Sequence, residues 1–162
     1  RRFHGKAQRQ LHGRMMAPTP QEIAERCTAV MWPDDHAARG LGITIVSTTP
    51  GGAKVTMPVR QDMVNGHGIC HGGFIFALAD TNFAYACNSF NHKAVAAGVD
   101  INFIAPAHLG DTLTAVGSAR HQGGRSGIYD IEVTNQDGRV VAVFRGRSTR
   151  IKGHFFDESE AT

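Results

Sequence analysis

The sequence predicts an α+β fold, a single domain in which an antiparallel β-sheet wraps around one long, buried α-helix. Three observations support this prediction. Residues 72–89 are apolar on almost every side of a helical wheel, as expected of a buried helix. Runs of alternating apolar and polar residues before and after this segment indicate strands, and turn signals join several of them. Strands joined by hairpins around one apolar helix favour an antiparallel sheet.

The first element in the chain is a helix with a clear N-terminal signal. Thr19 is the expected N-cap, Pro20 the first helical residue, and Glu22 stands three residues after the cap, as in a capping box. Apolar side chains at helical spacing continue to the Trp32-Pro33 pair, which is expected to end this helix.

Strands are predicted on both sides of the long helix. Residues 34–36, which follow the first helix, are expected to form a solvated loop. Turn signals at Pro50-Gly51-Gly52 and at Asp137-Gly138 join the first two and the last two strands. The predicted strands cover residues 41–49, 53–59, 95–105, 112–120, 127–135 and 139–151.

The long helix carries one carboxylate, Asp80, among apolar side chains. A buried helix gives an unpaired carboxylate little solvation, so burial is expected to raise its pKa. At the start of the helix, Gly72 and Gly73 leave the first backbone N–H groups uncovered, where the helix dipole favours negative charge. One segment therefore offers both a carboxyl group with a raised pKa, suited to acid/base chemistry, and a site for an oxyanion. This combination points to catalysis.

The spacing of these two features predicts an oligomer. Gly72 and Asp80 are eight residues apart, which is about 12 Å along one helix. One small reacting centre cannot contact both. We therefore expect the Asp80 of one subunit to meet the Gly72 of another, in a composite site formed by two antiparallel copies of the helix.

Composition limits the remaining possibilities. The chain has 162 residues, 41% of them hydrophobic, which suits one well-buried core. Its net charge is +3, but residues 1–14 hold five Arg and Lys and no acidic residue, which leaves 12 basic against 14 acidic residues in the rest. No basic stripe interleaved with aromatic residues is found, so nucleic-acid binding is not expected.

Three regions are expected along the chain. Residues 1–16 are predicted to be a basic extension, either disordered or added upstream of a natural start. Residues 17–152 are expected to form the domain. Residues 153–162 are expected to form a polar tail that is frayed from Asp157 onward. No apolar run is long enough to span a membrane. Three widely spaced cysteines do not form a disulfide pattern, and a cytoplasmic location is expected.

Other chemistry receives less support. His67, Cys70 and His71 resemble metal ligands, but a zinc site needs three or four convergent ligands at recognisable spacing, so no metal is expected. Cys87 is expected to be an inert core thiol. For Asp80, pairing with a buried partner such as His71 is the structural alternative to catalysis.

Residues 20–151 resemble the hotdog-fold acyl-CoA thioesterases, most closely the PaaI branch linked to phenylacetate degradation. The residues that carry the resemblance are Asn65, His71-Gly72-Gly73, Asp80 and the AYACNS run at 84–89. The resemblance implies a hotdog fold, hydrolysis of an aromatic acyl-CoA such as phenylacetyl-CoA, and dimers paired into tetramers. It implies no cofactor, since coenzyme A belongs to the substrate.

The resemblance also implies roles for individual residues. Asp80 would be the general base or the nucleophile, and the Gly72 N–H would polarise the thioester carbonyl. His71 and Asn65 would position the thioester or the attacking water. The coenzyme A nucleotide would lie against Gly73 and the 122–127 turn, through Gly123, Gly124, Arg125 and Ser126.

This chain departs from some relatives at one place. They carry a Ser or Thr on the strand after the long helix, whereas residues 96–99 here have no hydroxyl. Water positioning would then depend on Asn65 and Asp80 alone, or would involve Thr81 or Asn82.

Two other functions are compatible with the same fold. A hydroxyacyl-thioester dehydratase would use His71 opposite a carboxylate, and it would yield an enoyl product instead of a free thiol. A non-catalytic acyl-CoA-binding module would need no Asp80 and would bind without releasing thiol.

Overall fold

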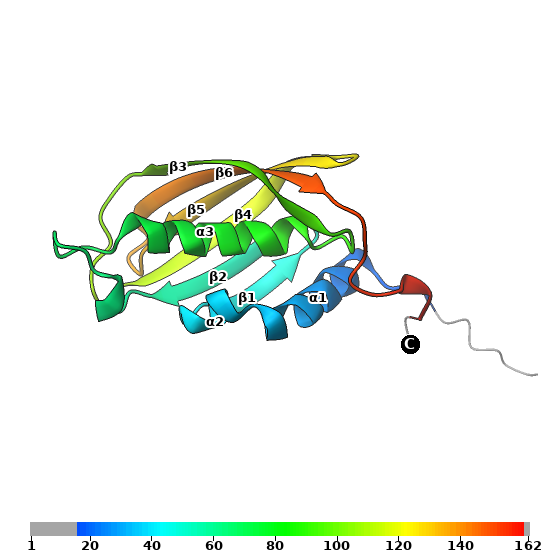
Figure 1. Cartoon of the computed structure of the whole chain (residues 1–162), viewed down its shortest axis with the longest axis horizontal. Coiled ribbons are helices and arrows are strands. Elements are labelled where there is room, and N and C mark those ends of the chain that lie inside the picture. Colours follow the sequence, from blue (N-terminus) through cyan, green and yellow to red (C-terminus); the bar gives the residue numbers. More distant parts are fainter. Residues whose placement is uncertain (1–15, 161–162) are drawn as a thin grey trace, which may run out of the picture.

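The computed structural model describes residues 16–160, so the expectations for residues 1–15 and 161–162 lie outside the described part. It has the hotdog fold: a six-stranded antiparallel sheet wraps around the long helix α3, Gly72–Cys87 (Figure 1). The strand order is β1-β2-β4-β5-β6-β3. The strands are β1 (Thr44–Thr49), β2 (Gly52–Pro58), β3 (Ala94–Phe103), β4 (Thr112–Gly123), β5 (Ser126–Thr134) and β6 (Val140–Arg150).

Two shorter α-helices precede the sheet. Helix α1 (Pro20–Met31) begins as predicted, since the Thr19 hydroxyl oxygen accepts a hydrogen bond from the Glu22 amide at 3.1 Å. Helix α2 (His36–Gly40) follows it, and both lie near the β1 edge of the sheet (Figure 1). Short 3-10 turns cover Trp32–Asp34, Gln61–Met63 and Glu158–Glu160.

The loop expected at residues 34–36 is wrong, because Asp35 is the N-cap of α2. One carboxylate oxygen of Asp35 accepts from the Ala38 amide at 3.2 Å, and the other accepts from the buried Tyr85 hydroxyl at 3.0 Å. Asp35 thereby connects α2 to α3. The strand expected from residue 41 starts only at Thr44, since Gly42 adopts a positive φ of 71°.

Helix α3 is anchored to the sheet in its second half. Phe83 packs on the backbone of Gly146, where a Cβ would lie 2.8 Å from the ring. Two residues beyond Asp80, the fully buried Asn82 side chain donates to the Ala53 carbonyl at 2.7 Å and to the Ala115 carbonyl at 2.8 Å. These contacts fix the helix, and with it Asp80, relative to β2, β4 and β6.

Strand β3 has an apolar face that its own chain does not cover. It pairs only with β6, so it forms one edge of the sheet. The alternating apolar residues that predicted this strand remain largely exposed, with Val95 at 45%, Val99 at 37% and Phe103 at 53%. An edge strand with exposed main-chain groups and apolar side chains is suited to pairing with another chain.

The segment after β6 is held against the domain as far as Glu158, one residue beyond the point where the tail was expected to begin fraying. Asn91, which is buried and has a φ of 60°, accepts hydrogen bonds through its side chain from the Phe155 and Phe156 amides. Its side-chain amide donates to Glu158 at 3.2 Å. The partners are more than 60 positions apart, so no local pattern could indicate this contact.

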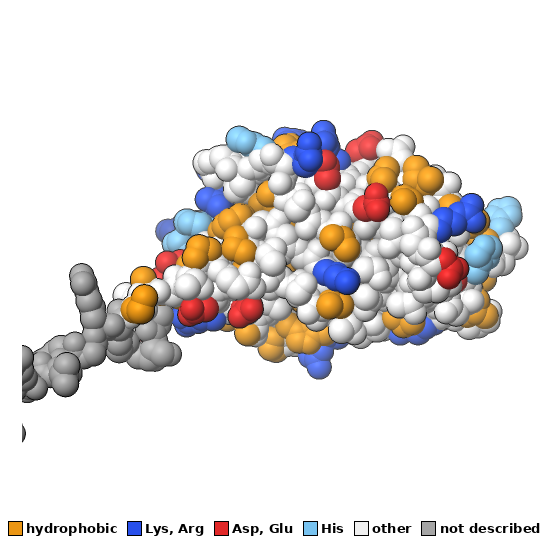
Figure 2. Space-filling view, turned by 180° about the vertical axis from the view of Figure 1, so that it is seen from behind, with side chains coloured by type: hydrophobic (Ala, Val, Ile, Leu, Met, Phe, Trp, Pro, Cys, Tyr) orange, Lys and Arg blue, Asp and Glu red, His pale blue; other side chains and the backbone are white. Residues whose placement is uncertain are grey.

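The surface of the described residues has mixed character. On the face shown in Figure 2, Lys and Arg side chains are spread among acidic and apolar ones and do not form a single stripe. No helix within residues 16–160 is long and apolar enough to cross a membrane.

Candidate functional site

The N-terminus of α3 presents free backbone donors. His71 is the N-cap, and its side chain does not cap the helix. The His71 amide donates to the Met63 carbonyl at 2.7 Å, whereas the Gly72 and Gly73 amides have no acceptor within residues 16–160. These are the first two N–H groups of the helix, so they point along its axis with the positive end of the dipole. They form a site for a carbonyl oxygen or an anion.

A pocket of about 570 Å³ opens beside these donors. Phe103 at the end of β3 covers Gly72 so closely that a Cβ at position 72 would lie 2.9 Å from the ring. The close approach of the Phe103 ring favours glycine at position 72. Because glycine has no side chain, its backbone lies at the pocket surface. The pocket is lined by Asn65, Ile69, Cys70, Gly72, Ile75, Phe103, Ile104, Ala105 and Pro106.

Asn65 shapes the loop that leads into α3. Its side-chain oxygen accepts from the His67 amide at 2.9 Å and from the Ile69 amide at 3.3 Å, and its own amide donates to the Ile69 carbonyl. The Asn65 side-chain NH₂ has no acceptor among the described residues and belongs to the pocket lining. It is therefore available as a donor to a bound group, close to Gly72.

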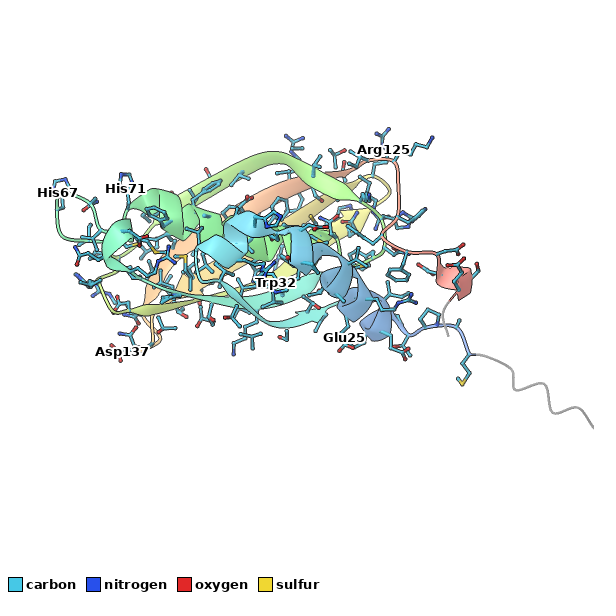
Figure 3. All side chains as sticks on the ribbon, turned by 60° about the horizontal axis from the view of Figure 1, so that its bottom comes forward. Glu25, Trp32, His67, His71, Arg125 and Asp137 are labelled. Atoms are coloured by element: carbon cyan, nitrogen blue, oxygen red, sulfur yellow. The ribbon has the colours of Figure 1, made fainter. Side chains whose placement is uncertain are left out.

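His71 lies beside the pocket but does not line it. Its side chain is exposed, and Figure 3 shows it at the same end of the molecule as His67. Among residues 16–160, no group of three or more His, Cys, Asp or Glu side chains is arranged to hold a metal ion.

Asp80 lies in the second half of α3, outside this pocket. Its side chain is half-buried, and burial raises the pKa of the carboxyl above its ordinary value. No described residue donates a hydrogen bond to it, so the expected alternative of a buried pair with His71 is not found. A desolvated carboxylate without a partner is suited to accept a proton or to attack a carbonyl carbon.

The hydroxyl and amide that follow Asp80 are both engaged within the protein. Thr81 donates its hydroxyl proton to the Ala77 carbonyl at 2.7 Å within the helix. Both protons of the Asn82 amide are used by strand carbonyls. The Asn82 side chain is also fully buried, so it does not reach a water bound beside Asp80 from solvent.

The predicted nucleotide-binding residues lie elsewhere. Gly123, Gly124, Arg125 and Ser126 form the tip of the β4–β5 hairpin, with Gly124 at a φ of 54°. Figure 3 shows Arg125 at the opposite end of the molecule from His71. Within one protomer the structure therefore brings Asn65 and Gly72 together, and it separates them from the hairpin.

The cysteines do not offer a reactive thiolate. All three are buried and free, and burial raises the pKa of each thiol, for Cys87 to about 12. A thiol with a raised pKa is a poor nucleophile near neutral pH.

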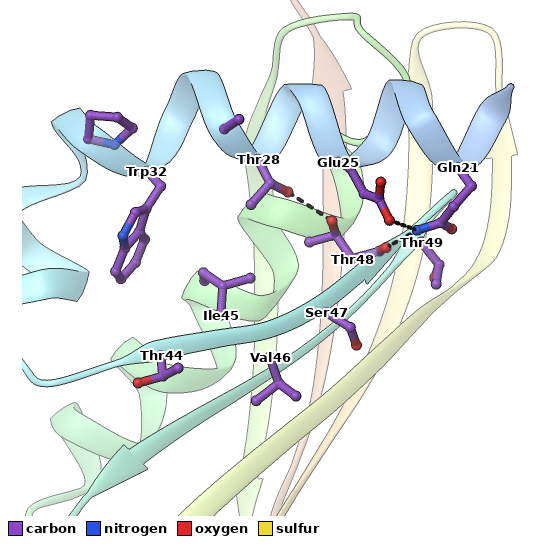
Figure 4. A pocket seen from close by; sticks show the side chains of 12 residues that line it. Gln21, Glu25, Thr28, Trp32, Thr44, Ile45, Val46, Ser47, Thr48 and Thr49 are labelled. Carbon is purple, nitrogen blue, oxygen red and sulfur yellow. Dashed lines mark hydrogen bonds between the residues drawn. The ribbon is translucent and has the colours of Figure 1, made fainter. Parts of the chain in front are cut away.

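A second groove, of about 580 Å³, lies between α1 and β1 and contains none of the predicted site residues (Figure 4). Several of its polar groups are paired within the protein: Gln21 donates to the Thr48 carbonyl at 2.8 Å, and the Thr28 hydroxyl donates to the Thr48 hydroxyl at 2.9 Å. Trp32 and Ile45 form its apolar end (Figure 4).

Sequence reasoning missed the wall of the pocket beside Gly72. Phe103, Ile104 and Pro106 belong to it, although residues in this segment were predicted only as part of a strand. The available signal was the resemblance itself, which extends along residues 99–106.

Comparisons with known proteins agree with this geometry. A family model described as the thioesterase superfamily matches residues 67–142. The chain is 52% identical over 129 residues to the acyl-coenzyme A thioesterase PaaI of Escherichia coli (strain K12), a match that covers 80% of this chain and 92% of that protein.

Solved structures give the same result. The E. coli PaaI protein from the phenylacetic acid degradation operon matches with a TM-score of 0.83 and 49% identity, over 84% of this chain and 99% of that chain. A Streptococcus mutans UA159 protein bound to acetyl CoA matches with a TM-score of 0.67 and 31% identity, over 69% of this chain and 90% of that chain. The chain therefore belongs to the thioesterase superfamily, within the PaaI family of acyl-coenzyme A thioesterases.

Proposed function

We propose that this chain hydrolyses the thioester of an aromatic acyl-CoA to the free acid and coenzyme A, at active sites built from two subunits. The observation that carries the proposal is the separation along α3 of an unpaired, half-buried carboxylate and two free backbone donors. The aromatic substrate class is supported by the similar E. coli protein, which comes from a phenylacetic acid degradation operon.

The reaction needs a nucleophile and a place for the developing negative charge. Asp80 accepts a proton from water, and the water oxygen attacks the thioester carbonyl carbon. The Gly72 N–H of the partner subunit stabilises the oxyanion. When the intermediate collapses, the C–S bond breaks, and the coenzyme A thiolate takes up the proton from Asp80. In the alternative route the Asp80 carboxylate attacks the carbonyl carbon, and the C–S bond breaks as the coenzyme A thiolate leaves. Water then hydrolyses the resulting anhydride, which restores the Asp80 carboxylate, and the released proton passes to the thiolate.

Assembly supplies the second half of each site. Two copies of α3 that run antiparallel bring Asp80 of each subunit toward Gly72 of the other, which overcomes the distance of about 12 Å along one helix. The uncovered apolar face of edge strand β3 supports a homodimer. Pairing of such dimers gives a homotetramer.

The remaining predicted residues recognise and orient the substrate. Asn65 donates from the wall of the pocket, and the exposed His71 side chain, next to Gly72 in the chain, orients the thioester or the attacking water. Gly73 and the hairpin residues Gly123, Gly124, Arg125 and Ser126 contact coenzyme A, with the Arg125 guanidinium near a phosphate. The acetyl CoA-bound relative supports a coenzyme A site in this fold. Free, buried thiols support a cytoplasmic location.

Replacing Asp80 by Asn tests the proposal, because the amide has nearly the same shape but can neither accept the proton nor attack. Thiol release from phenylacetyl-CoA and from straight-chain acyl-CoAs is measured for the wild type and the variant. We expect kcat to fall about 10³-fold, while coenzyme A still binds and the fold is retained. A variant as active as the wild type would exclude Asp80 from the chemistry.

A further inference from the structure

Strand β4 contains an irregularity that changes which side chain faces the interior near the hairpin. Its buried residues alternate through Leu113, Ala115 and Gly117, and the register with β5 then shifts between Ala119 and His121. One extra residue in a strand moves every later side chain to the opposite face. Because of this β-bulge, Gln122 points toward the inner face of the sheet.

Gln122 lies across the backbone of its neighbour on β5. It pairs with Gly127, and a Cβ on that glycine would lie within 2.3 Å of the Gln122 side-chain oxygen. The glycine leaves space for the Gln122 side chain to reach Tyr129, whose fully buried hydroxyl donates to the same oxygen at 2.5 Å. A Cβ at position 127 would occupy the space that this contact uses.

The other end of the Gln122 amide holds the turn. Its NH₂ donates to the Ser126 carbonyl at 3.2 Å. On the other side of the turn, the Arg125 carbonyl accepts from the Arg150 amide at 2.7 Å. Two consecutive carbonyls of the hairpin tip are therefore fixed, one by the main chain of the strand end and one by a side chain anchored in the core.

We propose that Gln122 is a positioning residue for acyl-CoA: by joining the buried Tyr129 hydroxyl to the Ser126 carbonyl, it holds the β4–β5 hairpin tip in the shape that binds the nucleotide end of coenzyme A. This inference rests on the assignment of the hairpin to coenzyme A under Proposed function. Gln122 itself does not touch the reacting atoms. Its loss therefore affects recognition of the nucleotide and leaves the chemical step unchanged.

The test compares two substrates that share one acyl group: the acyl-CoA, and the acyl-pantetheine thioester, which lacks the nucleotide. Tyr129→Phe removes one hydroxyl and keeps the buried ring, and Gln122→Ala removes the whole link. Tyr85→Phe is the matched control, because it removes the hydroxyl of the other tyrosine, which donates to Asp35 instead. Thermal unfolding of each variant is measured alongside.

We expect Tyr129→Phe and Gln122→Ala to raise KM for acyl-CoA about 3- to 10-fold, the equivalent of one hydrogen bond. Their kcat for acyl-CoA and both constants for acyl-pantetheine should stay within about twofold of the wild type. Tyr85→Phe should leave the ratio of the two KM values unchanged. Equal losses on both substrates, or no loss on either, would overturn the proposed role of Gln122.

Arg125→Ala distinguishes the positioning role of Gln122 from the proposal that the hairpin binds coenzyme A. If Arg125→Ala raises KM for acyl-CoA alone while Tyr129→Phe and Gln122→Ala do not, the hairpin binds the nucleotide and only the positioning role of Gln122 is wrong. If Arg125→Ala has no effect on either substrate, the assignment of the hairpin is wrong, and the inference about Gln122 is overturned with it.

Discussion

The N-terminus and the middle of α3 differ in the kind of group that they offer to a substrate. At the N-terminus the groups are backbone amides of Gly72 and Gly73, next to an open pocket. In the second half the group is the Asp80 side chain, set among apolar neighbours that raise its pKa. The amides are accessible because glycine has no side chain to cover them. The properties of the carboxyl depend on one side chain, Asp80, and on its burial.

Under the proposed function, one helix carries an oxyanion site and a base that are too far apart to serve the same reaction within one subunit. Separation along the helix keeps the carboxylate away from the positive end of the dipole, which would otherwise lower its pKa. In the proposed dimer, the two groups meet only across the subunit interface. The following predictions test the contribution of the Gly72 amide and then combine it with that of Asp80.

Gly72→Pro should have the largest effect in this series. Proline has no N–H, so it removes the proposed oxyanion donor, and it is well tolerated at the first position of a helix. His71 already has a φ of −63° and a ψ of 133°, which suits a residue before proline. We expect kcat for acyl-CoA hydrolysis to fall about 10²- to 10³-fold.

The control for this variant is Gly72→Ala, which keeps the N–H. Its methyl group meets the Phe103 ring at 2.9 Å, but that ring is half exposed and can move. A smaller loss of kcat is therefore expected for Gly72→Ala than for Gly72→Pro. A folded Gly72→Pro enzyme with wild-type kcat would show that this amide is not the donor.

Combining two inactive variants should restore activity if each site uses both subunits. Asp80→Asn and Gly72→Pro chains are co-expressed with different affinity tags, and the mixed dimers are purified by both tags. One of the two sites in each mixed dimer then has an intact Asp80 and an intact Gly72, so about half of the wild-type activity is expected. Mixed dimers as inactive as the parent variants would contradict a shared site.

Asn82→Ala should weaken the anchor that holds α3 to the sheet. The variant loses two buried hydrogen bonds, to the Ala53 and Ala115 carbonyls. We expect the free energy of unfolding, measured by urea denaturation, to fall by about 1–3 kcal/mol. The exposed Asn102 is the control, and Asn102→Ala should change stability by less than about 0.5 kcal/mol. Equal effects would show that Asn82 is not an anchor.

Asp80→Asn should make the protein slightly more stable near neutral pH while abolishing activity. Burial raises the folded-state pKa of Asp80 above its ordinary value of 3.8. The folded state therefore holds a proton that the unfolded state has released, and the free energy of unfolding falls as pH rises through this window. The amide does not ionise, so the advantage of the variant should be absent below pH 3.8 and complete above the raised pKa.

Urea denaturation from about pH 3.5 to about pH 7.5 measures this difference between variant and wild type. Asp137→Asn is the control, because Asp137 is exposed in a turn where an Asn-Gly pair is equally suitable. A stability difference for Asp80→Asn that does not depend on pH would mean that the carboxyl is not desolvated in the folded protein.

Local signals in the sequence predicted much of this fold. The Thr19 N-cap and the Asp137-Gly138 turn act between residues close in the chain, and the structure has them where the pattern indicated. The apolar wheel of α3 and the isolated carboxylate Asp80 were visible for the same reason. Gly72 was recognisable as a candidate oxyanion donor because a glycine at the start of a helix leaves its N–H group uncovered.

Other features depended on partners that are distant in the sequence. Asn82 was a candidate for positioning water until its contacts with β2 and β4 were known. Asp35 was assigned to a loop because its partner Tyr85 is 50 residues away. The alternation in β3 indicated a covered face, but the strand lies at the edge of the sheet, and only the strand order could show this.

The amino-acid sequence alone thus determined helices α1 and α3, the hairpin turns, and the two chemical groups on α3, since periodicity, capping and glycine conformation act over a few residues. Only the tertiary structure decided which strand lies at the edge and which polar side chains are hydrogen-bonded inside the core. It also decided how the bulge in β4 directs Gln122 toward Tyr129. Those outcomes depend on hydrogen bonds and packing between distant segments, and such pairings leave no local pattern in the chain.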